Sequence, residues 1–123
     1  MRHGLPSSLL LDHPALLVLL LGLRMRVHAL TEAIDAAGRD LLAGAGLGEF
    51  FLHRTGHGIG LSVHEEPYIV AGNDIPVEPG MAFSIEPGIY FSGRWGARIE
   101  DIVIVTEDGC EPVNTRPHSL TIL

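Results

Sequence analysis

Glycine and proline interrupt the chain so often after Gly44 that no long helix fits there. The 123 residues include 15 glycines and 8 prolines, and short apolar stretches lie between them. Such stretches, bounded by turn-forming residues, are typical of β-strands. They lie at residues 49–52, 61–63, 67–70, 81–85, 88–91 and 97–106. Glu107-Asp108-Gly109 predicts a turn, and residues 119–123 predict a last strand.

The segment before these strands has helical periodicity. Its apolar residues recur at the spacing of one helix face and are Val27, Leu30, Ile34, Leu41 and Leu42. The spacing predicts an amphipathic helix over about 27–45, ended by the glycines at 44, 46 and 48. One helix followed by a mostly antiparallel sheet is an α+β arrangement.

Composition narrows the classes of function. A chain of 123 residues has room for one hydrophobic core. The formal charge of −7 argues against nucleic-acid binding, which needs a basic face. A single cysteine, Cys110, cannot form an internal disulfide. We therefore expect a reducing compartment, the cytoplasm.

The first 26 residues differ in character from the rest. They are rich in leucine, yet the longest uncharged run, residues 15–23, is far shorter than the roughly 20 residues that cross a bilayer. A membrane span is therefore not expected. A signal peptide is one interpretation, but Arg24 and Arg26 follow the apolar run. We favour an apolar leader over residues 1–26, left by a chain start that is not the natural one, and a separate domain over 27–123.

Two glutamates are expected to oppose each other in a hairpin. A turn centred on Gly93 pairs antiparallel residues whose numbers sum to about 186, and Glu86 and Glu100 satisfy this sum. Like charges directly opposite are destabilising, so a positive group should lie between them. Arg98 lies on the same strand face as Glu100 and supplies one charge; a divalent cation would supply two.

Histidines give this cation a further ligand. His57 lies between glycines, where backbone and substrate can approach closely, and a neutral imidazole binds divalent transition metals. His53 and His64 flank it in the stretch HRTGHGIGLSVHEEP. Each feature alone is also typical of an ordinary turn or an exposed strand end. Together they predict a metal site.

Three motifs in order resemble those of the pita-bread metallopeptidases, a group that includes methionine aminopeptidases, Xaa-Pro aminopeptidases and prolidases. The motifs are HRTGHGIGLSVHEEP, EPGMAFSIEPGIY and GARIEDIVIVTEDG. The resemblance covers about four fifths of the chain, from residue 27 to the end. PGIY at 87–90 and RIED at 98–101 favour the branch that cleaves before proline. The implied fold is the C-terminal half of the pita-bread, a helix followed by a curved, mostly antiparallel sheet.

The resemblance also implies roles for individual residues. It makes His57, Glu86 and Glu100 metal ligands, with Glu100 bridging two divalent ions, manganese first, with cobalt, zinc or iron as alternatives. His53 and His64 would hydrogen-bond the substrate, and Arg98 would lie beside the bridging carboxylate. Glu86 would also carry a proton. The implied reaction is hydrolysis of the peptide bond that precedes a proline at the second position.

The resemblance is incomplete in one respect. A full site of this kind has five protein ligands, and its two aspartates come from a segment upstream of the helix that has no counterpart here. We therefore expect a fragment with an incomplete dinuclear site, with sheet edges and apolar surface left exposed. The alternatives are a peptide-binding module without catalysis and a creatinase-like C–N hydrolase. A homodimer that covers the exposed edges also stays open.

Overall fold

The fold is that of a computed structural model, which describes residues 28–118. Its elements are α3 (Thr31–Gly44), the 3-10 helix η1 (Gly48–Phe50), β1 (Gly56–Gly58), β2 (Glu65–Ile69), β3 (Ala82–Ile85), β4 (Gly88–Phe91), β5 (Trp95–Arg98), β6 (Asp101–Thr106) and β7 (Gly109–Pro112). The predicted leader over 1–26, with its boundary to the domain at 27–123, and the predicted strand over 119–123 lie outside the described residues.

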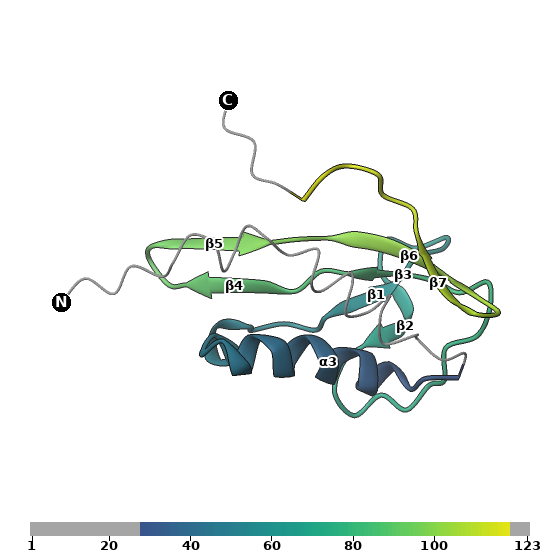
Figure 1. The fold of residues 1–123 in the computed structure, drawn as a ribbon, viewed down its shortest axis with the longest axis horizontal. Coiled ribbons are helices and arrows are strands. Elements are labelled where there is room, and N and C mark those ends of the chain that lie inside the picture. Colours follow the sequence, from purple (N-terminus) through teal and green to yellow (C-terminus); the bar gives the residue numbers. More distant parts are fainter. Residues whose placement is uncertain (1–27, 119–123) are drawn as a thin grey trace.

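Within residues 28–118, the strands form two antiparallel sheets beside the α-helix α3. The larger sheet has the order β2-β1-β3-β6-β7, and β4 pairs with β5 in a separate hairpin. Helix α3 runs along one side of the larger sheet, and the hairpin extends past the sheet toward the end of the helix (Figure 1). The expected α+β arrangement, one helix followed by a mostly antiparallel sheet, is confirmed.

The hydrophobic core lies between α3 and the larger sheet. Strand β6 alternates buried and partly exposed positions, as expected for a strand with one face on a core. The buried apolar side chains come from the helix, from three strands and from the loop before β3. They are Ile34, Ile69, Val77, Phe83, Ile85, Val103 and Val105.

Both ends of α3 are held by backbone contacts. At its start, the Thr31 and Glu32 amides donate to carbonyls of the loop at 73–75, which replaces a side-chain cap. At its end, Gly46 adopts a φ of 72°, and the Leu47 amide donates to the Leu42 carbonyl at 2.8 Å. This is the Schellman arrangement that glycine favours. The predicted helix and its glycine stop are confirmed, with a start at residue 31 instead of 27.

Two predicted strands are wrong. Glu49 and Phe50, the first two residues of the strand predicted over 49–52, belong to the helix η1, since the amides of Phe50 and Phe51 donate to carbonyls three residues earlier. Residues 61–63 form a bend in which Leu61 and Val63 are exposed. The Glu65 carboxylate accepts from the Ser62 amide at 2.8 Å, which holds the chain in a turn. Apolar residues at these positions therefore do not indicate strands.

The predicted strand over 97–106 is two strands, β5 and β6. They are separated at Ile99 and Glu100, where the chain passes from the hairpin to the larger sheet. The predicted turn at Glu107-Asp108-Gly109 is confirmed, because Thr106 pairs with Gly109. The strand that follows it, β7, was not predicted.

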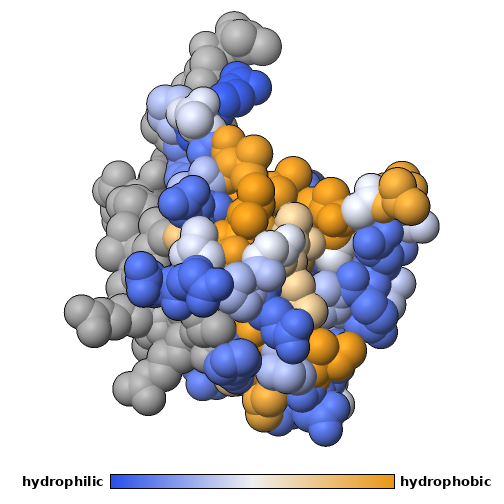
Figure 2. Space-filling model, turned by 90° about the vertical axis from the view of Figure 1, so that its right-hand side faces the viewer, coloured by the Kyte–Doolittle hydropathy of each residue, from blue (hydrophilic) through white to orange (hydrophobic). Residues whose placement is uncertain are grey.

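Apolar surface is exposed in the described part of the chain. One face carries a band of hydrophobic surface between hydrophilic areas (Figure 2). Among the described residues, the exposed large hydrophobic ones are Leu30, Leu52, Leu61, Val63, Trp95, Ile104 and Val113. No helix within residues 28–118 combines the length and the apolar character that a bilayer crossing requires.

Candidate metal centre

The candidate site is built around β1, a three-residue strand inside the larger sheet. Its two glycines bring three backbones close together: a Cβ on Gly56 would lie 1.7 Å from the Ser84 carbonyl oxygen, and one on Gly58 would lie 2.1 Å from that of Glu66. Only glycine fits at either position. His57, between them, is 7% exposed.

The hydrogen bond of one ring nitrogen indicates which nitrogen of His57 carries the hydrogen in a neutral ring. Nδ1 lies 3.0 Å from the Gly58 carbonyl oxygen, which can only accept, so Nδ1 carries the hydrogen. In a neutral ring, Nε2 then holds a lone pair. This Nε2 lies 3.1 Å from Oε1 of Glu86, another acceptor. Two acceptors at this distance call for a proton or a cation between them.

Glu86 is held at the end of β3 by several contacts. Its amide donates to the Thr55 carbonyl at 2.7 Å, and its side chain is largely buried. Oε1 accepts from the Ser84 hydroxyl at 2.8 Å, and that hydroxyl accepts from the His57 amide at 3.1 Å. Oε2 accepts from Nη1 of Arg98 at 3.2 Å. The carboxylate is therefore oriented before any ligand arrives.

Arg98 supplies the positive charge expected beside Glu86. Its Nε also donates to the Tyr90 hydroxyl at 2.8 Å, so the guanidinium is held between a carboxylate and a phenol. Tyr90 lies on the neighbouring strand β4, where it pairs with Gly96, two residues before Arg98. Arg98 was expected between Glu86 and Glu100, beside the Glu100 carboxylate; among residues 28–118 it forms an ion pair with Glu86 and none with Glu100.

The predicted register is confirmed on both sides of the two glutamates. Ile85 pairs with Asp101 in one ladder, and Gly88 pairs with Arg98 in the other; both pairs have the sum 186. Glu86 and Glu100 lie between these ladders and form no pair in either, so the expected direct opposition of the two glutamates in a hairpin is not observed. Glu100 is exposed, whereas Glu86 is buried. Within residues 28–118, no three His, Cys, Asp or Glu side chains gather closely enough to hold a metal ion.

The other two predicted histidines lie near His57. The ring of His64 stands 4.4 Å from that of His57, centroid to centroid, and it is exposed. His53 donates from Nδ1 to the Arg54 carbonyl at 2.7 Å. Its Nε2 is buried and has no hydrogen-bond partner among the described residues. That nitrogen is therefore free to accept a hydrogen bond from a ligand.

An ion pair of a buried aspartate and a partly exposed arginine stabilises the loop that carries these residues. Asp35, fully buried on α3, accepts from Arg39 Nε at 2.6 Å and from the Thr55 hydroxyl at 2.7 Å. Arg39 also donates from Nη2 to the His53 carbonyl at 2.6 Å. The pair thus connects the helix to the backbone on both sides of Arg54.

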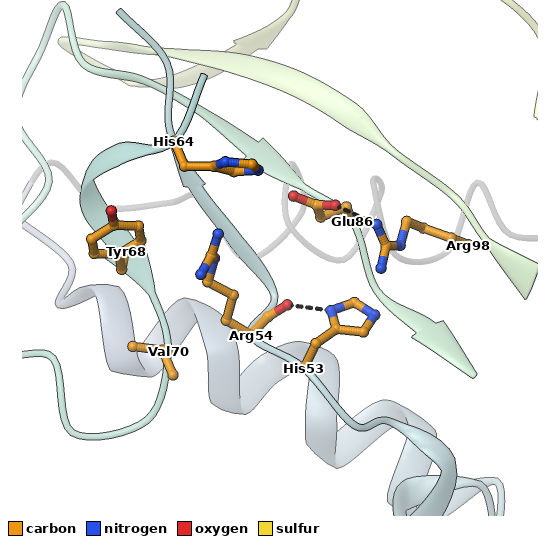
Figure 3. A pocket seen from close by; sticks show the side chains of 7 residues that line it. All are labelled: His53, Arg54, His64, Tyr68, Val70, Glu86 and Arg98. Carbon is orange, nitrogen blue, oxygen red and sulfur yellow. Dashed lines mark hydrogen bonds and ion pairs between the residues drawn. The ribbon is translucent and has the colours of Figure 1, made fainter. Parts of the chain in front are cut away.

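An open pocket of about 560 Å³ joins the site to solvent. Its walls are formed by the side chains of His53, Arg54, His64, Tyr68, Val70, Glu86 and Arg98. Four of the six predicted site residues therefore line one pocket, and their side chains converge on it from separate elements (Figure 3). His57 lies behind Glu86, in contact with it.

Four residues of the site were not predicted: Ser84, Arg54, Tyr68 and Tyr90. Ser84 had a signal in the sequence, since it lies two residues before Glu86 and hence on the same strand face. The other three had none, because a lone arginine or tyrosine near a turn is usually an exposed residue.

Comparison with known proteins extends the resemblance. The model of metallopeptidase family M24 matches residues 19–107, which begins inside the predicted leader. The chain is 71% identical over 99 residues to a protein of Mycobacterium bovis named probable dipeptidase PepE, covering 80% of this chain and 26% of that protein. It is 52% identical over 92 residues to an Xaa-Pro dipeptidase of Lactobacillus helveticus, covering 75% and 25%.

Solved structures agree with these similarities. The crystal structure of dipeptidase PepE from Mycobacterium ulcerans has a TM-score of 0.75 at 70% identity, over 77% of this chain and 26% of that one. X-Pro aminopeptidase from Thermotoga maritima has a TM-score of 0.82 at 36% identity, over 98% and 35%. The chain thus spans about a quarter of the curated relatives it matches. By sequence and by fold, it belongs to metallopeptidase family M24.

Proposed function

We propose that this chain carries part of the active site of a metal-dependent peptidase that hydrolyses the bond preceding proline. The observation that carries the proposal is the approach of His57 Nε2 to Glu86 Oε1 at 3.1 Å. Both atoms are electron-pair donors, both are largely buried, and both are of the types that bind divalent transition metals. The names of the relatives, dipeptidase and Xaa-Pro dipeptidase, support the choice of substrate.

Two of the residues present, His57 and Glu86, fit as part of the ligand set of a divalent metal ion, whereas Glu100 does not gather with them among residues 28–118. The Nδ1 hydrogen bond to the Gly58 carbonyl leaves Nε2 free as a ligand, and such an outer contact is typical of metal-binding histidines. Ser84 and Arg98 orient the Glu86 carboxylate in the same way. We propose His57, Glu86 and Glu100 as ligands, with manganese first and cobalt, zinc or iron as alternatives. Two ions would occupy the complete site.

Metal ions bound there would supply a water activated near neutral pH and would polarise the scissile carbonyl. Glu86 would accept a proton and pass it to the leaving proline nitrogen. Arg98 keeps Glu86 oriented toward the pocket. His53 and His64 hold the substrate, His53 as an acceptor at Nε2. The single cysteine, Cys110, supports a cytoplasmic setting for this chemistry.

The purified chain is tested first, by following the release of proline from Ala-Pro in the presence of Mn²⁺. A second sample is a chimera, in which the matching segment of the Lactobacillus helveticus Xaa-Pro dipeptidase is replaced by that of this chain. This chimera supplies the rest of an Xaa-Pro site. We expect it to release proline in a Mn²⁺-dependent manner.

Two variants of the chimera control the interpretation. His57→Ala should abolish proline release, whereas Arg94→Ala, in the exposed β4–β5 turn, should leave it unchanged. A folded chimera that binds Mn²⁺ and Ala-Pro but releases no proline would contradict the proposal. That outcome would favour a peptide-binding module instead.

A further inference from the structure

The hydrogen on the His53 ring is placed by a backbone carbonyl. Nδ1 lies 2.7 Å from the Arg54 carbonyl oxygen, the contact drawn as a dashed line in Figure 3. A carbonyl can only accept, so in a neutral ring Nδ1 carries the hydrogen and Nε2 holds the lone pair. If this carbonyl turned away, Nδ1 would lose its acceptor. The direction of the Arg54 carbonyl therefore decides what His53 offers to the pocket.

That direction is set from the other side of the same peptide unit. A peptide unit is planar and trans, so its carbonyl and its N–H point in opposite directions. Here the N–H is that of Thr55, which donates to the Ile69 carbonyl at 2.9 Å and to Oδ1 of Asp35 at 3.2 Å. The Thr55 hydroxyl donates to the same Oδ1 at 2.7 Å. These contacts, two of them to Asp35, hold the unit with its carbonyl toward the His53 ring.

The preceding peptide unit, which joins His53 to Arg54, is held by Arg39. Nη2 of Arg39 donates to the His53 carbonyl at 2.6 Å, and Nη1 donates to the Phe51 carbonyl at 3.3 Å. The guanidinium is itself fixed, because Nε donates to Oδ2 of Asp35 at 2.6 Å and the guanidinium carbon lies 4.4 Å from the centre of the Phe51 ring. One pair of side chains on α3 thus fixes both peptide units beside Arg54.

The chemistry described so far makes no use of Asp35 and Arg39, and neither side chain lines the pocket. Asp35 is fully buried, which is costly for a carboxylate. Well-packed apolar side chains in place of a buried ion pair are often as stable or more stable. What apolar side chains cannot supply is direction, because they do not orient backbone carbonyls and amides.

We propose that Asp35 and Arg39 are positioning residues for His53, which hold its ring in the Nδ1–H tautomer and so keep Nε2 an acceptor in the pocket wall. The inference rests on the proposed function in one respect, because that function gives the acceptor a use. A substrate N–H or ammonium group can donate to a lone pair on Nε2. A ring in the other tautomer would present a hydrogen there and repel such a donor.

The test is a long-range ¹H–¹⁵N NMR spectrum of the histidine rings in the ¹⁵N-labelled chain, recorded about two pH units above the ordinary histidine pKa. Ring nitrogens with a hydrogen and with a lone pair resonate in separate ranges, so the spectrum gives the tautomer ratio without metal or substrate. We expect the Nδ1–H form of His53 to exceed the Nε2–H form at least about tenfold. Arg39→Gln should lower this ratio at least about threefold. Arg39→Lys keeps a cation beside Asp35 but loses the fork, so its ratio should be intermediate.

Two controls separate positioning from stability. Val105→Ala leaves a cavity in the core on β6 and should destabilise the fold without changing the His53 ratio. His57 is the control within each variant, because its Nδ1 faces the Gly58 carbonyl, which Arg39 does not contact. Its tautomer should stay the same throughout.

A dominant Nε2–H form of His53 in the wild-type chain would overturn the inference. So would an unchanged ratio in a folded Arg39→Gln chain, or an equal fall in Val105→Ala. If Arg39→Gln does not fold, Arg39→Lys decides by the same criterion. A chimera that releases no proline would refute the proposed function, whereas the tautomer ratio, which needs no turnover, would still decide this inference.

Discussion

Replacing Asp35 by alanine should strongly destabilise the domain. Asp35 is fully buried and accepts three hydrogen bonds, one from Arg39 and two from the amide and hydroxyl of Thr55. The substitution leaves Arg39 Nε and the Thr55 hydroxyl without this acceptor, while the Thr55 amide keeps its hydrogen bond to the Ile69 carbonyl. Breaking a buried ion pair by removing one partner costs roughly 3–5 kcal/mol.

The stability loss of Asp35→Ala should lie at the lower end of this range, because the Arg39 side chain is 34% exposed and water can reach it. We therefore expect a loss of about 3 kcal/mol in the free energy of unfolding. A domain of this size has about 5–15 kcal/mol in total. Asp35→Asn keeps an oxygen for Thr55 but loses the charge toward Arg39, so its loss should be about half as large.

Urea unfolding, followed by circular dichroism, measures the effect. With a slope of about 1.5 kcal/mol per molar urea, the Asp35→Ala midpoint should fall by about 2 M. Asp40→Ala removes an exposed carboxylate from the same helix and should change stability by less than about 0.5 kcal/mol. Equal effects of the two alanine variants would refute the reasoning.

Two further predictions concern close packing and the cysteine. Gly56→Ala should lower the free energy of unfolding by about 3 kcal/mol or more, because its Cβ would lie 1.7 Å from the Ser84 carbonyl oxygen. The Cβ of Gly44→Ala would meet nothing within 4 Å, so this variant should be neutral or stabilising in the same unfolding assay. Similar losses in both variants would contradict this. Burial raises the pKa of the Cys110 thiol, so the pH at which iodoacetamide labelling reaches half its maximal rate should be higher in the folded chain than in urea. For the same reason, the free energy of unfolding should fall as the pH rises past the ordinary thiol pKa, because the unfolded chain loses that proton first; equal labelling midpoints would show that burial does not act on the thiol.

The hairpin register could be predicted because the position of the turn fixes the sum of the residue numbers in each antiparallel pair. A turn at Gly93 fixes every opposed pair, and the sum of 186 holds on both sides of the site. Helix α3 could be predicted for a similar reason, since its apolar spacing and its glycine stop are local in sequence. The placement of Arg98 near Glu86 follows from the same register.

The role of β1 could not be predicted from periodicity. A three-residue strand of two glycines and a histidine has no alternation to read, and its close contacts with Ser84 and Glu66 depend on strands distant in sequence. The ion pair of Asp35 and Arg39 could not be predicted for another reason. A charged pair four residues apart on a helix is usually exposed, and nothing in the sequence indicates that Asp35 is buried.

The central claim is that His57 and Glu86 bind a metal ion, and paramagnetic broadening by Mn²⁺ tests it most directly. Substoichiometric Mn²⁺ is added to the ¹⁵N-labelled chain, and the amide signals that broaden first are identified. We predict that those of His57, Gly58 and Glu86 broaden first, and that His57→Ala removes the effect while His118→Ala does not. Broadening that begins at the acidic turn of Glu107 and Asp108, or that is unchanged in His57→Ala, would contradict the account.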